Sequence, residues 1–185
     1  MAIRQKSLAS IPIIVNIEPM RRKHLRSVVR IERAVYKRPW SAALFAEELV
    51  RRSDRTYLVA KVGRHLVGYA GILMQADAAH ISTISVAPNW QQMGIATRLM
   101  VSLAKESIQL GATGMTLEVR MSNQAAQEMY RKFGFRIEGV RKGYYQTENE
   151  DAIVMWAHDV QGPDFNEVIA HFEKKYAGST NVEIR

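Results

Sequence analysis

The stretch from residue 80 to residue 110 constrains the fold more than any other part of the sequence. Residues 80–86 have the composition of a strand and stop at Pro88, and residues 94–110 then carry apolar side chains at helical spacing. Gly111 follows, and a glycine just past the last periodic residue predicts the end of a helix. A strand that leads into a long amphipathic helix requires a sheet on which that helix can pack. The chain is therefore predicted to belong to the α/β (α+β) class.

The rest of the pattern predicts a mixed central sheet flanked by helices, because a hairpin meander is followed by a crossover helix. At 185 residues the chain suits one domain. We place this domain at 11–160, after a leader at 1–10 and before a C-terminal helix and tail at 161–185. Strands are predicted at 13–18, 56–62, 66–74, 115–120, 135–140 and 152–157, a turn at 77–79, helices at 19–35, 41–49, 123–132 and 164–176, and a tail over the last nine residues.

Composition excludes several classes of site. The chain has no cysteine, which excludes disulfides, Cys metal ligands and a Cys nucleophile, and which fits a cytoplasmic location. No apolar run approaches the roughly 18 residues that a membrane span needs. The net charge of +8 favours anionic partners, either a polyanionic environment such as the ribosome or an anionic small cofactor. A basic surface that only aids solubility is the alternative.

The basic and imidazole side chains give no metal or nucleic-acid motif. The run Arg21-Arg22-Lys23 is interpreted as a solvated helix face, with docking on RNA-rich particles as the alternative. No interleaved aromatic motif supports direct binding of nucleic acid. The histidines lack metal-ligand spacing, so we predict no metal and interpret them as surface or helix residues: His24, His65, His80, His158 and His171.

The turn before the long helix is a candidate anion site. Backbone N–H groups at a helix start lack intrahelical partners, and the helix dipole favours an anion there. Gly94 and Ala96 have little or no side chain, so a pyrophosphate can approach the backbone, and Thr97 adds a hydroxyl donor. A glycine that is needed only for tight helix packing is the alternative. A dinucleotide-binding fingerprint is a poor match, because there is no G-x-G-x-x-G.

Here the residues carry a resemblance to a known family. The run "ISTISVAPNWQQMGIATRLM" resembles the acetyl-CoA motif R/Q-x-x-G-x-G/A of the GNAT acetyltransferases, with Gln91, Gly94 and Ala96 in its three fixed places. The stretches "TLEVRMSNQAAQEMYRKFGF" and "RKGYYQTENEDAIVMW" resemble the following strand and helix and the last hairpin. With "RPWSAALFAEEL", they resemble the branch that acetylates the N-terminal alanine of a ribosomal small-subunit protein. The resemblance covers residues 12 to 158.

The resemblance implies the GNAT acyl-CoA N-acyltransferase fold, acetyl-CoA as co-substrate, and a protein or peptide N-terminus as acceptor. Because no Cys can carry an acetyl group, direct transfer in a ternary complex is favoured. The resemblance further implies a strand that splays from its neighbour and offers backbone groups to the pantetheine arm of the cofactor. The cofactor-binding residues are predicted to be Ile84, Ser85, Val86, Gln91, Gln92, Met93, Gly94, Ile95, Ala96, Thr97, Asn123 and Tyr130.

Two side chains are candidates for proton transfer. Glu118 lies on the opposite strand face from its apolar neighbours, and a carboxylate in a central strand is costly to bury. The resemblance assigns it as the base that deprotonates the amine; a solvated Glu or an ion pair with Arg120 is the alternative. Tyr130 lies on the inward helix face and can donate a proton to the departing sulfur. A core tyrosine with a backbone partner is the alternative.

Tyr144 and Tyr145 are the candidate substrate-binding residues. The resemblance places their hairpin, and the loop between the first two helices, along the peptide groove, and paired tyrosines suit the holding of a peptide backbone. Ordinary cross-strand aromatics are the alternative. Two other functions stay open at this point: acetylation of a small amine such as a polyamine or aminoglycoside, and a non-catalytic acyl-CoA-binding or ribosome-associated module. The sequence leaves the oligomeric state open.

Overall fold

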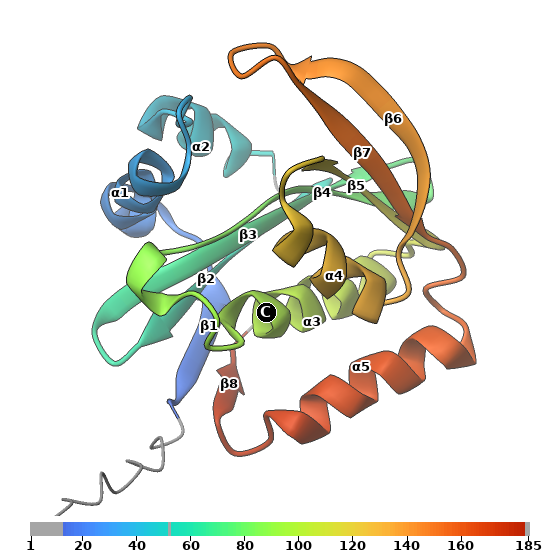
Figure 1. Cartoon of the computed structure of the whole chain (residues 1–185). Helices are drawn as coiled ribbons and strands as arrows, with labels where there is room; N and C mark the ends of the chain where they lie inside the picture. Colours follow the sequence, from blue (N-terminus) through green and yellow to red (C-terminus); the bar gives the residue numbers. More distant parts are fainter. Residues whose placement is uncertain (1–12, 52, 184–185) are drawn as a thin grey trace, which may run out of the picture.

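A single sheet organises the part of the chain that the structure, a computed structural model, describes, which is residues 13–51 and 53–183 (Figure 1). The predicted leader at 1–10 lies outside the described residues. Within them eight strands follow the order β6-β7-β5-β4-β3-β2-β1-β8, parallel only at β4–β5 and β1–β8. The mixed sheet that the sequence predicted is therefore confirmed.

The elements run as follows: β1 Val15–Pro19, η1 Arg22–His24, α1 Leu25–Val35, α2 Ala42–Glu48, β2 Arg55–Val62, β3 His65–Gln75, β4 Ala78–Val86, η2 Pro88–Trp90, α3 Ile95–Gln109, β5 Gly114–Arg120, α4 Gln124–Lys132, β6 Arg136–Tyr145, β7 Glu150–Ala157, α5 Pro163–Lys175 and β8 Thr180–Val182. None of the helices in the described ranges is long and apolar enough to cross a membrane.

Helices cover both faces of the sheet, and each face has its own apolar core. Figure 1 shows α1 and α2 on one face, and α3, α4 and α5 on the other. The alternation along β2 explains how one strand serves both cores. Tyr57 and Val59 pack with α1 and α2, whereas Leu58 and Ala60 pack with α3.

Three of the predicted helix ends are confirmed by their caps, whereas the predicted start at residue 19 is wrong, because Pro19 belongs to β1 and pairs with Leu58. The Ser41 side chain accepts a hydrogen bond from the backbone N–H of Leu44 at the start of α2, and Asn123 accepts one from Ala126 at the start of α4. Gly111 follows α3 with a φ of +90°, a left-handed conformation that glycine adopts without steric cost. These features depend on residues three or four positions apart, which is why the sequence alone predicts them.

Longer-range pairing changed several predicted boundaries. The 77–79 turn is shorter than predicted, because β4 already begins at Ala78, and the closing hairpin extends to Tyr145 and Glu150. The predicted tail is wrong at residues 180–182, which form β8 beside β1. Three residues are too few for an alternation of apolar and polar side chains to predict a strand. Whether they pair with β1 depends on where α5 places them. This helix returns the chain across the sheet and stacks Phe172 on Phe133, with ring centroids 4.6 Å apart.

One interruption of the sheet prepares the functional site. The parallel pairs between β4 and β5 stop at Ile81 and Leu117, although β4 continues to Val86 and β5 to Arg120. Beyond these pairs each strand is bonded only on its outer side, to β3 or to β7. The two strands therefore present unpaired backbone edges to a gap between them. This separation confirms the splayed strand that the resemblance predicted.

Candidate active site

The gap between β4 and β5 opens into a cavity of about 410 Å³. Its walls come from β4, β5, α4, the α1–α2 loop and the β6–β7 hairpin. The structure brings six of the predicted site residues together on these walls: Ile84, Glu118, Asn123, Tyr130, Tyr144 and Tyr145.

Glu118 projects from β5 into the cavity and is held by two basic groups. Its side chain is 8% exposed, its Oε2 lies 3.3 Å from His80 Nε2, and its Oε1 lies 3.0 Å from Arg141 Nη1. The alternative pairing with Arg120 is not formed, because Arg120 pairs with acidic residues of the hairpin. A nearly buried carboxylate with a basic neighbour on each oxygen is positioned to exchange a proton with a group in the cavity.

His80 was not predicted as a site residue, and its interpretation as a surface or helix residue is wrong. It lies half-buried in β4, where parallel pairing sets it beside Thr116 and so next to Glu118. Burial lowers the pKa of His80, and Arg141 lowers it further, whereas Glu118 acts in the opposite direction. The imidazole is therefore neutral at pH 7. No local signal reveals this pairing, because the two residues are far apart in the sequence and meet only through strand register.

The lowered histidine pKa values predict a loss of stability in acid. Burial also lowers the pKa of His24 in η1, so both residues take up protons more readily in the unfolded chain. Because the unfolded state then binds more protons as pH falls below about 6.5, the free energy of unfolding decreases between pH 7 and pH 5. Urea unfolding of His80→Gln should show a smaller decrease over this interval than the wild type. His65→Gln, at the exposed start of β3, serves as the control, and identical decreases in all three proteins would contradict the prediction.

Tyr130 reaches the same cavity from α4. Its side chain is 7% exposed and packs against Phe135, with ring centroids 5.7 Å apart. Burial raises the pKa of its hydroxyl, with Tyr36 and Tyr145 adding to the effect, so the phenol stays protonated at neutral pH. Among the described residues this hydroxyl has no hydrogen-bond partner, and the backbone partner expected of an ordinary core tyrosine is not found. A buried phenol with an unused donor faces the cavity.

Tyr144 and Tyr145 both line the cavity although adjacent strand residues normally face opposite sides. The pairing of β6 with β7 shifts between Arg141 and Tyr145, and Gly143 has a φ of +61° within the shifted stretch. This irregular backbone turns both rings to one side, edge to face and 5.1 Å apart. Burial raises the pKa of Tyr145 to about 12, so its hydroxyl remains a donor.

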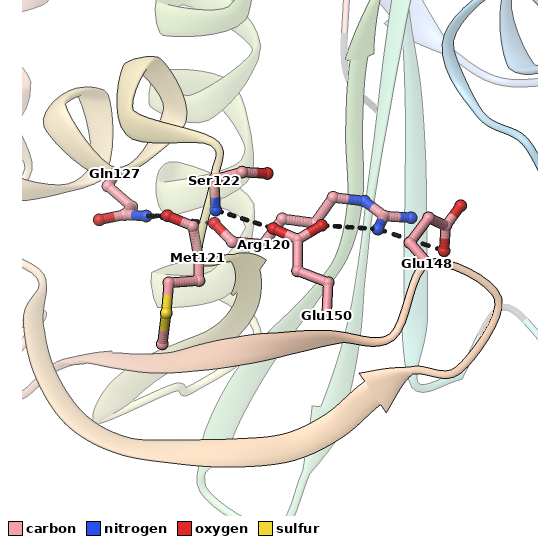
Figure 2. A network of polar contacts seen from close by, with 6 residues as sticks. All are labelled: Arg120, Met121, Ser122, Gln127, Glu148 and Glu150. Atoms are coloured by element: carbon pink, nitrogen blue, oxygen red, sulfur yellow. Dashed lines mark hydrogen bonds and ion pairs between the residues drawn. The ribbon is translucent and has the colours of Figure 1, made fainter.

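Arg120 ties the hairpin to the end of β5, as Figure 2 shows. Its guanidinium contacts Glu150 at 3.2 Å and Glu148 at 3.4 Å, and lies 3.8 Å from the centre of the Tyr145 ring. Glu150 also accepts a hydrogen bond of 2.8 Å from the backbone N–H of Ser122. These contacts fix the hairpin tip over the strand that carries Glu118.

A buried carboxylate that the sequence did not reveal holds the α1–α2 loop. Glu32 is 3% exposed; its Oε1 accepts a hydrogen bond from the Tyr69 hydroxyl and its Oε2 one of 3.3 Å from the backbone N–H of Trp40. Burial raises the pKa of Glu32. Tyr36 lies at the start of the same loop and lines the cavity, and burial raises the pKa of its hydroxyl. The helical spacing marked Glu32 only as part of α1, so its inward role depends on the packing of α1 against the sheet.

The predicted anion turn lies at the start of α3. Gly94 is the N-cap, with a φ of +74° and no side-chain cap, and the first helical hydrogen bond runs from Arg98 N–H to the Gly94 carbonyl. The N–H groups of the intervening residues 95–97 therefore have no helical carbonyl to donate to. Gln91 braces the turn by donating a hydrogen bond of 3.1 Å to the Val86 carbonyl.

The C-terminal segment contacts this turn. A Cβ at Gly94 would collide with the hydroxyl and ring of Tyr176, which also stacks on the Arg98 guanidinium at 4.3 Å. The turn itself does not line the cavity, and neither do Ser85 and Val86, which are buried. β4 connects the cavity with the turn, because its middle part borders the cavity and its C-terminal end leads into the turn. An elongated ligand could therefore lie along β4 from the turn to Glu118.

Comparison with known proteins agrees with this geometry. The Acetyltransferase (GNAT) family description matches residues 25–135. The chain is 32% identical over 133 residues to the [ribosomal protein bS18]-alanine N-acetyltransferase of Escherichia coli (strain K12), covering 71% of this chain and 88% of that protein. It is 37% identical over 122 residues to N-alpha-acetyltransferase RimI of Mycobacterium tuberculosis (strain ATCC 25618 / H37Rv), covering 63% and 74%.

The fold agrees as well. The crystal structure of the ribosomal-protein-S18-alanine N-acetyltransferase from Escherichia coli superposes with a TM-score of 0.72 at 28% identity, covering 79% of this chain and 94% of that one. The family match spans more than half of the chain and includes β4, the turn, Glu118 and Tyr130. The chain therefore belongs to the GNAT family and is an N-acetyltransferase.

Proposed function

We propose that this enzyme transfers the acetyl group of acetyl-CoA to the N-terminal α-amino group of a protein, with the N-terminal alanine of ribosomal protein bS18 as the preferred acceptor. One observation carries the proposal: a nearly buried carboxylate, Glu118, and an unpartnered phenol, Tyr130, line one cavity at a break between parallel strands. A cytoplasmic location would follow from such a substrate.

The residues at the turn fit an acyl-CoA pyrophosphate. Backbone N–H groups without helical partners, at the positive end of a 15-residue helix, favour an anion. In this proposal the turn from Gln91 to Thr97 holds the pyrophosphate. The free edge of β4 near Ile84 holds the pantetheine amides, and Asn123 lies at the far side of the gap. The GNAT family uses acetyl-CoA.

The chemistry needs a neutral amine, a stabilised oxyanion and a protonated leaving group. Because α-amino groups have a pKa of about 7.7–8.0, most of the acceptor is protonated at pH 7. Glu118 takes that proton, directly or through one water, and the amine then attacks the thioester carbonyl. Unpaired N–H groups on the free edge of β4 are available to the developing oxyanion. As the C–S bond breaks, Tyr130 donates its phenolic proton to the sulfur, and the second proton that the nitrogen loses as the amide forms returns to the Tyr130 oxygen.

The cavity favours a peptide over a polyamine. Its carboxylates already have partners: Glu118 pairs with Arg141, Glu148 pairs with Arg120, and Glu32 accepts two hydrogen bonds. A polycation would find no unpaired carboxylate among the described wall residues. The named relatives in Escherichia coli support the choice of an N-terminal alanine.

A peptide panel tests the proposal. Peptides that differ only in their first residue, including the bS18 N-terminus, are incubated with acetyl-CoA and read by mass spectrometry. Acetylation of the α-amino group, fastest for alanine, is expected, and an N-terminally blocked peptide with an internal lysine should remain unmodified. Modification of the lysine alone, or turnover of spermidine but no peptide, would overturn the assignment.

Removal of the Tyr130 hydroxyl should lower the activity of the enzyme without changing its stability. Tyr130→Phe is expected to lower kcat at least about tenfold, because the sulfur would leave unprotonated. Since this hydroxyl has no partner among the described residues, the thermal midpoint should stay unchanged. Tyr69→Phe is the contrasting variant: its hydroxyl donates to buried Glu32, so about 1–3 kcal/mol of stability should be lost. Full activity in Tyr130→Phe would remove Tyr130 from the mechanism.

A further inference from the structure

The segment formed by η1, α1 and the loop after α1 is rich in exposed basic side chains. Eight Lys and Arg residues between positions 21 and 38 are all exposed. We call them the basic stripe: Arg21, Arg22, Lys23, Arg26, Arg30, Arg33, Lys37 and Arg38. Within α1, Arg26, Arg30 and Arg33 recur every three or four residues, which places them on one side of the helix, and the other members flank its two ends.

The basic stripe is unpaired and accounts for the charge of the whole protein. None of its eight members forms an ion pair with any described residue. The remaining 18 Lys and Arg of the chain equal its 18 Asp and Glu in number, so the net charge of +8 corresponds to this one surface. Basic residues that served only solubility would be distributed over the whole surface and not clustered in one segment.

The charges of the basic stripe destabilise η1 and α1. No acidic residue lies in the first turn of η1 or α1, where a negative charge would suit the helix dipole. Like charges four residues apart, such as Arg22 with Arg26 and Arg26 with Arg30, repel each other. A partner of opposite charge would relieve both effects.

A membrane surface does not fit the basic stripe. An interfacial helix needs a free apolar face, but Leu25, Val28 and Ile31 of α1 are buried against the sheet. Six of the eight members are arginines, whose planar guanidinium matches phosphate oxygens in pairs. From Arg22 to Arg33 the helix extends roughly 17 Å, a length over which a nucleic-acid duplex carries on the order of ten phosphate charges.

We propose that the basic stripe is a docking surface for the phosphate backbone of structured RNA. The stripe ends at the acceptor cavity, because Arg38 lines both. RNA bound along α1 would therefore hold a protein N-terminus close to Glu118 while that protein is still attached to its RNA. This last role rests on the proposed function, whereas RNA binding itself does not.

The first experiment measures RNA binding without acetyl-CoA or peptide. Fluorescence anisotropy with a labelled short RNA duplex compares the wild type with Arg26→Gln/Arg30→Gln/Arg33→Gln. At about 100 mM salt the triple variant should bind at least tenfold more weakly. The slope of log Kd against log salt should decrease by roughly two to three, since each lost phosphate contact removes about 0.7–0.9. The control Arg64→Gln/Lys132→Gln/Arg136→Gln removes three exposed charges elsewhere and should stay within about twofold of the wild type.

Each other outcome overturns the proposal. Equal losses in both triple variants would mean a non-specific charge effect. Binding of polyglutamate or of anionic phosphatidylglycerol vesicles that depends on the stripe, with no stripe-dependent RNA binding, would assign an acidic protein or a membrane instead.

A second experiment tests the link to catalysis. The stripe variant should acetylate free peptide at the wild-type kcat/KM but an RNA-bound ribosomal protein more slowly. Stripe-dependent RNA binding without any peptide turnover would contradict the proposed function alone. Peptide turnover without stripe-dependent RNA binding would contradict only the inference about the stripe.

Discussion

Glu118→Gln is expected to lower kcat for peptide acetylation by about 10²–10⁴-fold, the range typical of a lost general base. The amide keeps the size of the side chain and can still contact His80 and Arg141, but it cannot take a proton. The loss should shrink as pH rises from 7 to 9, because the acceptor amine then loses its proton to solvent. Steady-state rates with the alanine peptide over this pH range measure both effects.

Two controls make this result specific. The Kd for acetyl-CoA, measured by calorimetry, should match that of the wild type, because the turn that is proposed to hold the pyrophosphate lies outside the Glu118 cavity. Glu106→Gln makes the same chemical change at a half-buried carboxylate of α3, away from that cavity, and should leave kcat unaltered. A loss for Glu118→Gln that is the same at pH 7 and pH 9 would mean that the carboxylate positions a neighbour and does not accept the proton.

Gly94→Ala is expected to weaken acetyl-CoA binding by at least about tenfold. The φ of +74° at this position costs a residue with a Cβ about 1–2 kcal/mol, and every 1.4 kcal/mol is a factor of ten in affinity. The added methyl group would also collide with Tyr176, so either the turn or the C-terminal segment must move. Both effects displace the N–H groups that face the anion.

Gly111→Ala is the matched control for this variant. Gly111 ends the same helix with a φ of +90°, and a Cβ there meets nothing within 4 Å. It should lose similar stability to backbone strain and keep its affinity for acetyl-CoA. Calorimetric titration of both variants separates loss of the ligand site from loss of the fold. Equal affinity in Gly94→Ala and the wild type would show that the cofactor does not use this turn.

The candidate site was only partly accessible from the sequence. The residues that carry the resemblance, among them Glu118, Tyr130 and the tyrosine pair, do line one cavity. The sequence missed His80, Glu32 and Tyr36 on the same walls. A histidine in a strand or a glutamate in a helix has no local feature that distinguishes a wall residue from a solvated one. Their roles arise from strand register and from the packing of α1 on the sheet.

The sequence by itself determined most of the helices and strands and several helix ends, because periodicity and capping depend on residues at most a few positions apart. It also determined the turn at the start of α3, since unpaired N–H groups at the start of a helix are a property of that helix alone; that this turn binds an anion stays a prediction. Only the tertiary structure decided where β4 and β5 separate, that residues 180–182 complete the sheet, and that Glu118 pairs with His80 and Arg141. Contacts of this kind join residues that are distant in the sequence, and small changes in register or packing would exchange one partner for another.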